Sequence, residues 1–162
     1  MIEKIRETSQ NRLLTGAGGR WRMETVEVVE LGKASIITLM IKQVLDQNLL
    51  QPQKKSLMRE RILTVHLRVR EMLTTLFFEA TRIRAEDGVH GKPDLEISGD
   101  MQSLLAIALG ANPVRELWRR RLRIRPRRWR GILYAPRLLV LMQLGSPPAY
   151  LRWLAGVPRA VK

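Results

Sequence analysis

The stretch of residues 93–125 constrains the fold most, because its start and stop signals define four consecutive elements. An alternating apolar strand comes first, and the Ser and Asp of residues 98–100 can cap the helix that follows it. Gly110 suits the left-handed residue that ends a helix, and Asn112-Pro113 is typical of the start of another. Residues 121–125 alternate arginine with leucine or isoleucine, which predicts a second strand. This unit contains no candidate catalytic residue and favours a protein that holds a ligand over one that transforms it.

The rest of the chain also divides by hydrophobic period. Residues 34–50 carry a wide apolar stripe at helical spacing, and Pro52 ends the predicted helix. Residues 62–70 alternate apolar and polar side chains, and residues 73–85 continue with strand patterns. The apolar segment 132–144 is shorter than the roughly 20 residues that span a bilayer. A short amphipathic helix is predicted around Tyr150 and Leu154.

Length and composition favour one domain with additional segments at its ends. We expect an N-terminal extension at residues 1–33, a domain at 34–144 and a basic amphipathic tail at 145–162. The 162 residues include no cysteine, which excludes disulfides and thiolate metal sites and fits a reducing compartment. No signal peptide is recognisable. We therefore expect a cytoplasmic protein. A peripheral position on the inner face of the membrane is also compatible with this expectation.

Several of these segments together resemble the sterol carrier protein-2 family of small lipid-binding domains. The residues that carry the resemblance are Phe77-Phe78, residues 86–88, residues 92–99, the helix to Gly110 and residues 121–124. The resemblance implies an α+β fold, with a mixed or antiparallel sheet of about five strands and helices packed on one side. It also implies an apolar tunnel between sheet and helices for a sterol, acyl or isoprenoid lipid. Some bacterial members of the family are accessory factors that present isoprenoid-quinone precursors to enzymes.

Apolar positions on the predicted strands and helices are the candidate lipid-binding residues. Periodicity alone leaves two readings open, because the same stripe can serve a filled core or a cavity wall. The resemblance makes a cavity wall as plausible as a filled core. The candidates are Leu76, Phe78, Met101, Leu104, Leu105, Ala108, Leu117, Leu138, Leu141 and Met142.

Positive charge is concentrated near the C-terminus. The net charge is +14, and residues 111–162 hold 13 Lys/Arg against one Asp/Glu. A run of nine arginines and two tryptophans forms the candidate membrane- or anion-binding set: Arg115, Arg119, Arg120, Arg121, Arg123, Arg125, Arg127, Arg128, Arg130, Trp118 and Trp129. Arginine neutralises lipid phosphates and tryptophan favours the headgroup boundary, so we rank an anionic membrane first.

Nucleic acid and an acidic partner protein also fit the same arginine run. The alternative function is therefore a basic nucleic-acid-binding module, since arginines contact phosphates and tryptophans stack on bases. A lipid-metabolising enzyme with an acidic face is a further alternative, and the sequence does not rank it against a membrane.

Residues that carry catalytic or metal chemistry do not form a recognisable motif. His66 and His90 are the only histidines and lack metal-ligand spacing. Asp94 and Glu96 are two apart on one strand face and are expected to be solvated near arginines. We therefore expect no catalytic residue, metal or cofactor, and a non-catalytic lipid carrier.

Overall fold

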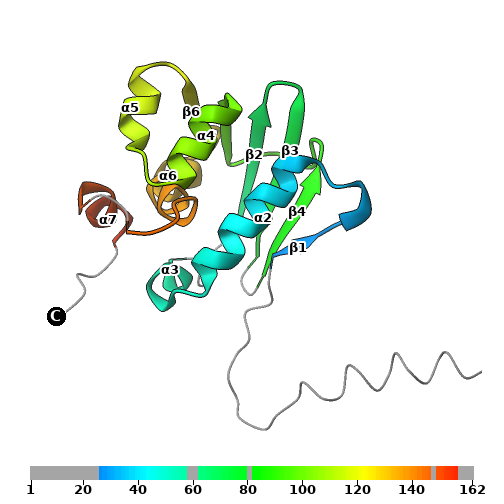
Figure 1. Ribbon diagram of the computed structural model, residues 1–162, viewed down its shortest axis with the longest axis horizontal. Coiled ribbons are helices and arrows are strands. Elements are labelled where there is room, and N and C mark those ends of the chain that lie inside the picture. The colour runs from blue at the N-terminus through cyan, green and yellow to red at the C-terminus, as the bar shows by residue number, and fades with distance from the viewer. Residues whose placement is uncertain (1–25, 58–61, 80–81, 147–148, 157–162) are drawn as a thin grey trace, which may run out of the picture.

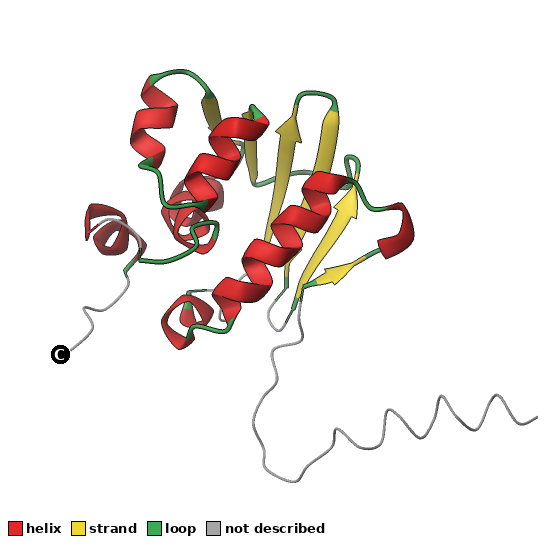
Figure 2. Ribbon diagram, viewed as in Figure 1, coloured by secondary structure: helices red, strands yellow, loops and turns green. Residues whose placement is uncertain are grey.

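The computed structural model describes residues 26–57, 62–79, 82–146 and 149–156 (Figure 1). The strands are β1 (Glu27–Val28), β2 (Leu63–Val69), β3 (Met72–Phe78), β4 (Ile83–Asp87), β5 (Leu95–Gly99) and β6 (Leu122–Pro126). The helices are the 3-10 turn η1 (Leu31–Lys33) and α2 (Ile36–Leu49), α3 (Pro52–Ser56), α4 (Met101–Ala108), α5 (Pro113–Trp118), α6 (Trp129–Leu141) and α7 (Ala149–Ala155). The predicted α+β class is thus confirmed (Figure 2).

One mixed sheet of six strands, in the order β1-β4-β3-β2-β5-β6, forms the framework of the described residues. Strand β2 pairs with β5 in the same direction, while β3–β4, β2–β3 and β5–β6 are antiparallel. The short β1 adds a parallel edge beside β4 and lies in the segment that the sequence assigned to an N-terminal extension. Pro126 ends the opposite edge strand, β6, where its missing amide costs no ladder hydrogen bond.

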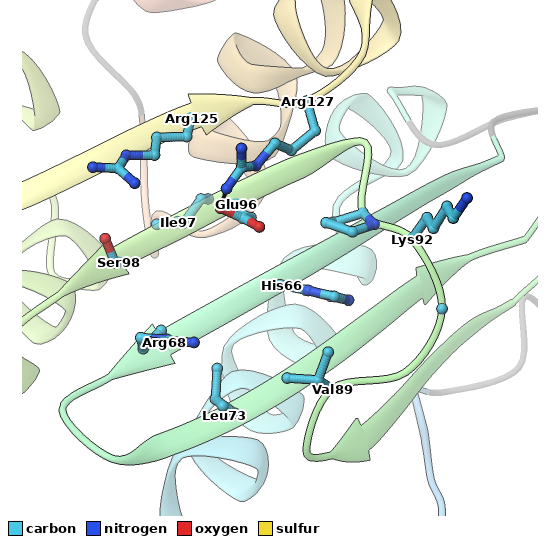
Figure 3. A pocket seen from close by; sticks show the side chains of 12 residues that line it. His66, Arg68, Leu73, Val89, Lys92, Glu96, Ile97, Ser98, Arg125 and Arg127 are labelled. Carbon is cyan, nitrogen blue, oxygen red and sulfur yellow. Dashed lines mark ion pairs between the residues drawn. The ribbon is translucent and has the colours of Figure 1, made fainter.

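Alternation along β2 separates the two faces of the sheet. Leu63, Val65, Leu67 and Val69 are buried on the face that packs against the helices. The residues between them include His66 and Arg68, which point to the opposite face (Figure 3). The helices lie behind the strands in that view, so the described helices cover one face only.

Helix α2 lies across this covered face (Figure 1). Ile37, Ile41 and Leu45 are fully buried at helical spacing and pack in the main core. Ser35 caps the helix by accepting a hydrogen bond from the Thr38 amide at 3.4 Å. The cap satisfies one of the free amides of the first turn and fixes where the helix begins.

The predicted signals of residues 98–113 are confirmed. Asp100 caps α4 and Asn112 caps α5, whose first residue is Pro113. Gly110 has a φ of +98°, the left-handed conformation expected of it. The carbonyl of Ala108 then accepts from the Leu144 amide, which joins the end of α4 to the residues after α6.

Helix α6 approaches the sheet closely at Gly131. A Cβ atom there would lie 2.2 Å from the carbonyl oxygen of Asp94, at the start of β5. The same carbonyl accepts the amides of Arg127 and Arg128, at 2.9 and 3.2 Å. The glycine thus lets the first turn of α6 rest on the sheet backbone.

A buried polar cluster joins α3 to the C-terminal end of α6. The Lys54 ammonium donates to the side-chain oxygen of Asn48 at 2.7 Å and to the carbonyl of Gln143. Asn48 in turn donates to the carbonyl of Leu141. Burial lowers the pKa of Lys54 from its ordinary value of 10.5, because water is removed from the charged form.

Candidate lipid-binding site

The space between the sheet and helices α4 and α6 is lined by apolar side chains. Strands β2, β3, β5 and β6 and helices α4 and α6 supply its lining, which consists of Val65, Leu67, Leu76, Ile97, Leu104, Ile107, Leu122, Leu138, Leu139 and Met142. Because these side chains offer no titratable or hydrogen-bonding group, a ligand there would be selected by size and shape.

The open volume at this place is small, about 20 Å³. Such a space holds roughly one water molecule, whereas pockets for drug-sized ligands measure about 300–1,000 Å³. The side chains from sheet and helices therefore meet and fill most of the interior. A lipid chain could enter only if α4 or α6 moved away from the sheet.

The structure brings most of the predicted lipid-binding residues to this interior. Leu76, Leu104, Leu138 and Met142 line the small cavity. Phe78, Ala108 and Leu141 are buried, and Met101 and Leu117 pack at the edge of the core. Leu105 is 41% exposed and points away from the interior.

Six lining residues were absent from the predicted set: Val65, Leu67, Ile97, Ile107, Leu122 and Leu139. The strand residues among them have a signal in the sequence, since the alternation of β2, β5 and β6 marks their inward positions. No signal in the sequence marks Ile107 as a lining residue, because residues 101–109 are apolar on more than one side of the helix. The cap at Asp100 and the sheet contact set the orientation of α4, which buries Leu104 and Ile107.

Ser103 and Glu116 form a buried pair that joins α4 to α5. The Ser103 hydroxyl donates to Glu116 Oε2 at 3.1 Å, and both residues are less than one tenth exposed. Glu116 is the only acidic residue of residues 111–162. Because this carboxylate points inward, it does not offset the positive charge on the surface around it.

All nine predicted arginines of the run are exposed, but they occupy two sides of the molecule. Arg115 and residues 119–121 lie on or just after α5, and Arg130 lies at the start of α6. Arg123 and Arg125 alternate with inward-facing Leu122 and Ile124, so they project from the uncovered face of the sheet.

Among the residues that the structure describes, two of these arginines form ion pairs. Arg127 pairs with Glu96 at 2.9 Å and Arg128 with Asp94 at 3.5 Å. Asp94 is buried and accepts the Thr64 amide at 2.9 Å. The prediction that both carboxylates are solvated therefore holds for Glu96, which is partly exposed, and is wrong for Asp94. The other seven arginines make no ion pair within the described residues.

Large apolar side chains are exposed on the helices next to these arginines. Trp118 is 87% exposed, Trp153 80% and Leu109 77%, and Trp129 and Leu154 are also exposed. The helices that carry them, α4 to α7, lie together at the β6 side of the molecule (Figure 1). Exposed tryptophans beside uncompensated arginines are unusual for a surface that meets only water.

Helices long and apolar enough to cross a membrane are absent from the described part of the chain. Within that part, there is also no group of three histidine, aspartate or glutamate side chains placed to hold a metal ion.

No family model matches the sequence, and a search of curated proteins found no match. Solved structures do match the fold. A structure titled "UbiJ-SCP2 Ubiquinone synthesis protein" superposes with a TM-score of 0.53 at 15% identity, over 77% of this chain and 95% of that one. The fold is that of the sterol carrier protein-2 domain. The resemblance found in the sequence is thereby confirmed for the fold.

Two further solved structures match at similarly low sequence identity. A stereoselective inverting sec-alkylsulfatase from Pseudomonas sp. matches with a TM-score of 0.52 at 12% identity, over 72% of this chain but only 18% of the sulfatase. A crystal structure of sterol carrier protein 2 matches less well, with a TM-score of 0.45 at 14% identity over 72% of this chain and 93% of that one. Since this fold also occurs within a much longer enzyme, function has to be argued from the residues of the site.

Proposed function

We propose that this protein is a non-catalytic lipid-binding domain that holds a sterol, acyl or isoprenoid lipid between its sheet and its helices. The observation that carries the proposal is the wholly apolar junction of four strands with α4 and α6, in a chain with the sterol carrier protein-2 fold. The apolar body of such a lipid would replace the contacts that the lining side chains now make with one another.

The lipid's metabolic setting is proposed from the likeness to the ubiquinone synthesis protein. An isoprenoid-quinone precursor has a long apolar tail, which suits a lining without polar groups. We therefore propose an accessory role in lipid or isoprenoid-quinone metabolism, in which the protein keeps the tail out of water and presents its ligand to an enzyme.

We further propose that the protein docks on an anionic membrane through the helices at the β6 side. Trp118 and Trp153 would enter the headgroup region, while Arg119, Arg120 and Arg121 face the lipid phosphates. Each basic residue near an anionic surface contributes about 1 kcal/mol, so these three arginines together would supply about 3 kcal/mol of affinity. Docking there would place α4 close to the source of the lipid.

Lipid uptake is tested by native mass spectrometry after incubation with palmitate or an isoprenoid alcohol. We expect a one-to-one complex with the wild type and at least tenfold weaker binding for Leu104→Phe, because the larger side chain fills the cavity that must open. Leu105→Phe changes the exposed neighbour on the same helix and should bind like the wild type. Failure of the wild type to bind any of these lipids would overturn the proposal.

Membrane docking is tested by flotation with vesicles. The wild type should float with vesicles that contain anionic lipid and stay behind with neutral ones. Replacing Arg119, Arg120 and Arg121 by glutamate should abolish flotation. Equal binding to neutral vesicles, or flotation that survives the triple change, would contradict the arginine mechanism and leave an acidic partner protein as the better occupant.

A further inference from the structure

The uncovered face of the sheet carries a groove of about 420 Å³, on the side opposite the helices (Figure 3). Its floor is β5, with β2 and β6 on either side, and residues 89–93 of the loop before β5 close one end. The lining is His66, Arg68, Leu73, Val89, Gly91, Lys92, Pro93, Glu96, Ile97, Ser98, Arg125 and Arg127.

Short and long side chains explain why the sheet is hollowed here. Ser98 lies on β5 opposite Arg68 of β2, and the carboxylate of Glu96 is drawn toward Arg127 at 2.9 Å. Arg125 lies on β6 opposite Glu96. Because strands are about 4.8 Å apart, β2 and β6 stand roughly 10 Å from each other across this floor. Arg68 and Arg125 therefore flank a trough rather than a flat surface.

Charge in the groove is unbalanced. The lining holds four lysine or arginine side chains and one carboxylate, an excess of three positive charges among these five groups. Glu96 pairs with Arg127, so Arg68, Arg125 and Lys92 have no ion-pair partner within the described residues. Basic side chains gathered around one groove repel one another. A bound anion would remove that repulsion, and planar guanidinium groups suit the oxygens of phosphate in particular.

The wall and floor of the groove are held in place without a ligand. His66 is 7% exposed, and its Nε2 donates to the carbonyl of His90 at 3.1 Å. The His90 amide donates to Thr75 Oγ1 at 3.1 Å, and Thr75 donates to the carbonyl of Gly88 at 2.7 Å. These bonds tie the loop after β4 to the two central strands, so little ordering would accompany binding.

We propose that this groove binds a water-soluble organic phosphate, with Arg68 and Arg125 holding its phosphate groups and Leu73, Val89 and Pro93 contacting its less polar part. The sheet itself separates this ligand from the proposed lipid. Val65 and Leu67 face the apolar interior, whereas His66 and Arg68 face the groove. A lipid between sheet and helices cannot reach through the strands to place its headgroup here, so the phosphate ligand is a second and independent one.

Calorimetric titration with inorganic diphosphate, in a phosphate-free buffer at physiological ionic strength, tests the site. We expect saturable one-to-one binding to the wild type and at least tenfold weaker binding to Arg68→Gln/Arg125→Gln. Arg119→Gln/Arg120→Gln removes the same charge from exposed arginines outside the groove and should bind within twofold of the wild type. Absence of saturable binding, or an equal loss in both double variants, would overturn the proposal.

A lysine variant and vesicles distinguish the remaining sources of binding. Arg68→Lys/Arg125→Lys keeps the charge but loses the planar fork, and should fall between the wild type and the glutamine variant. Flotation with vesicles that contain anionic lipid should be unchanged in Arg68→Gln/Arg125→Gln. If this variant instead lost vesicle binding as strongly as diphosphate binding, the occupant would be a membrane headgroup and the free ligand would be ruled out.

Discussion

Asp87 joins the end of β4 to the start of α2, and its replacement by asparagine is expected to weaken the fold. Its Oδ2 accepts the Ser35 amide at 2.6 Å. Its Oδ1 accepts the Ser35 hydroxyl at 2.8 Å and the Thr38 hydroxyl. Thr38 also contacts the Thr74 hydroxyl on β3 at 2.8 Å, so one carboxylate coordinates a helix cap and two strands.

The size of the loss follows from these bonds. A hydrogen bond to a charged group contributes about 1.5–3 kcal/mol, and a negative charge at a helix N-terminus adds about 0.3–1 kcal/mol. Asparagine keeps one acceptor oxygen but turns an NH₂ group toward donors of Ser35 or Thr38. One or two of the three bonds should therefore fail, and Asp87→Asn should lower the free energy of unfolding by about 2–4 kcal/mol at pH 7.

The same carboxylate predicts a dependence on pH. Burial by itself would raise the pKa of Asp87, but the hydrogen bonds from Thr38 and Ser35 outweigh it and lower the pKa below its ordinary value of 3.8. A lowered pKa in the folded state contributes stability that is complete above the unfolded pKa. That contribution disappears as the pH falls below 3.8 and through the folded pKa.

Urea unfolding followed by circular dichroism measures both effects. The difference between wild type and Asp87→Asn should be largest at pH 7 and shrink below pH 3.8. Glu86→Gln changes the neighbouring carboxylate, which pairs with Arg84 at 3.3 Å on the other face, and should cost about 1 kcal/mol or less. A loss below about 0.5 kcal/mol for Asp87→Asn, or a gap that persists unchanged at low pH, would refute the reasoning.

Two further changes test the packing of α6 and of α3. Gly131→Ala should lower the free energy of unfolding by about 3 kcal/mol in thermal melts, because its Cβ would meet the Asp94 oxygen at 2.2 Å; a near-neutral result would mean that α6 can shift. Since burial lowers the pKa of Lys54 below 10.5, the folded state releases this proton before the unfolded state, and stability gains from rising pH up to 10.5. Lys54→Met should remove that gain in urea midpoints measured between pH 7 and 10, and an unchanged alkaline profile would contradict the assignment.

Local signals predicted the boundaries of α4 and α5 well. Asp100, Asn112 and Gly110 each act over a few residues, so their effect can be read without the tertiary fold. Strand positions also followed from period-two alternation. The strand order did not, because the parallel pairing of β2 with β5 joins segments some 30 residues apart and no local rule specifies it.

The division of the arginine run between two surfaces could not be predicted from the sequence, for a related reason. Alternation shows that Arg123 and Arg125 share a face of β6, but which face depends on the side of the sheet that the helices cover. The exposure of Leu105 is a second example. Residues 101–109 are so rich in apolar side chains that the helical period leaves its buried side undetermined, and packing against the sheet decides it.

The nearly filled interior is what the energetics of an unoccupied lipid site lead one to expect. A cavity costs about 24 cal/mol per Å³, so the present volume of about 20 Å³ costs only about 0.5 kcal/mol. An empty tunnel of about 300 Å³, the low end for ligand pockets, would cost about 7 kcal/mol, as much as the entire stability of many domains. Without ligand, contact among Leu104, Leu138 and Met142 stabilises the folded state, because it avoids the cost of an empty cavity. The same apolar residues would line the opened site, which is why their pattern in the sequence fits a core and a cavity equally well. Ligand binding and opening must then occur together, and the proposed contact of α5 and α7 with a membrane would bring the lipid to the helices that have to move.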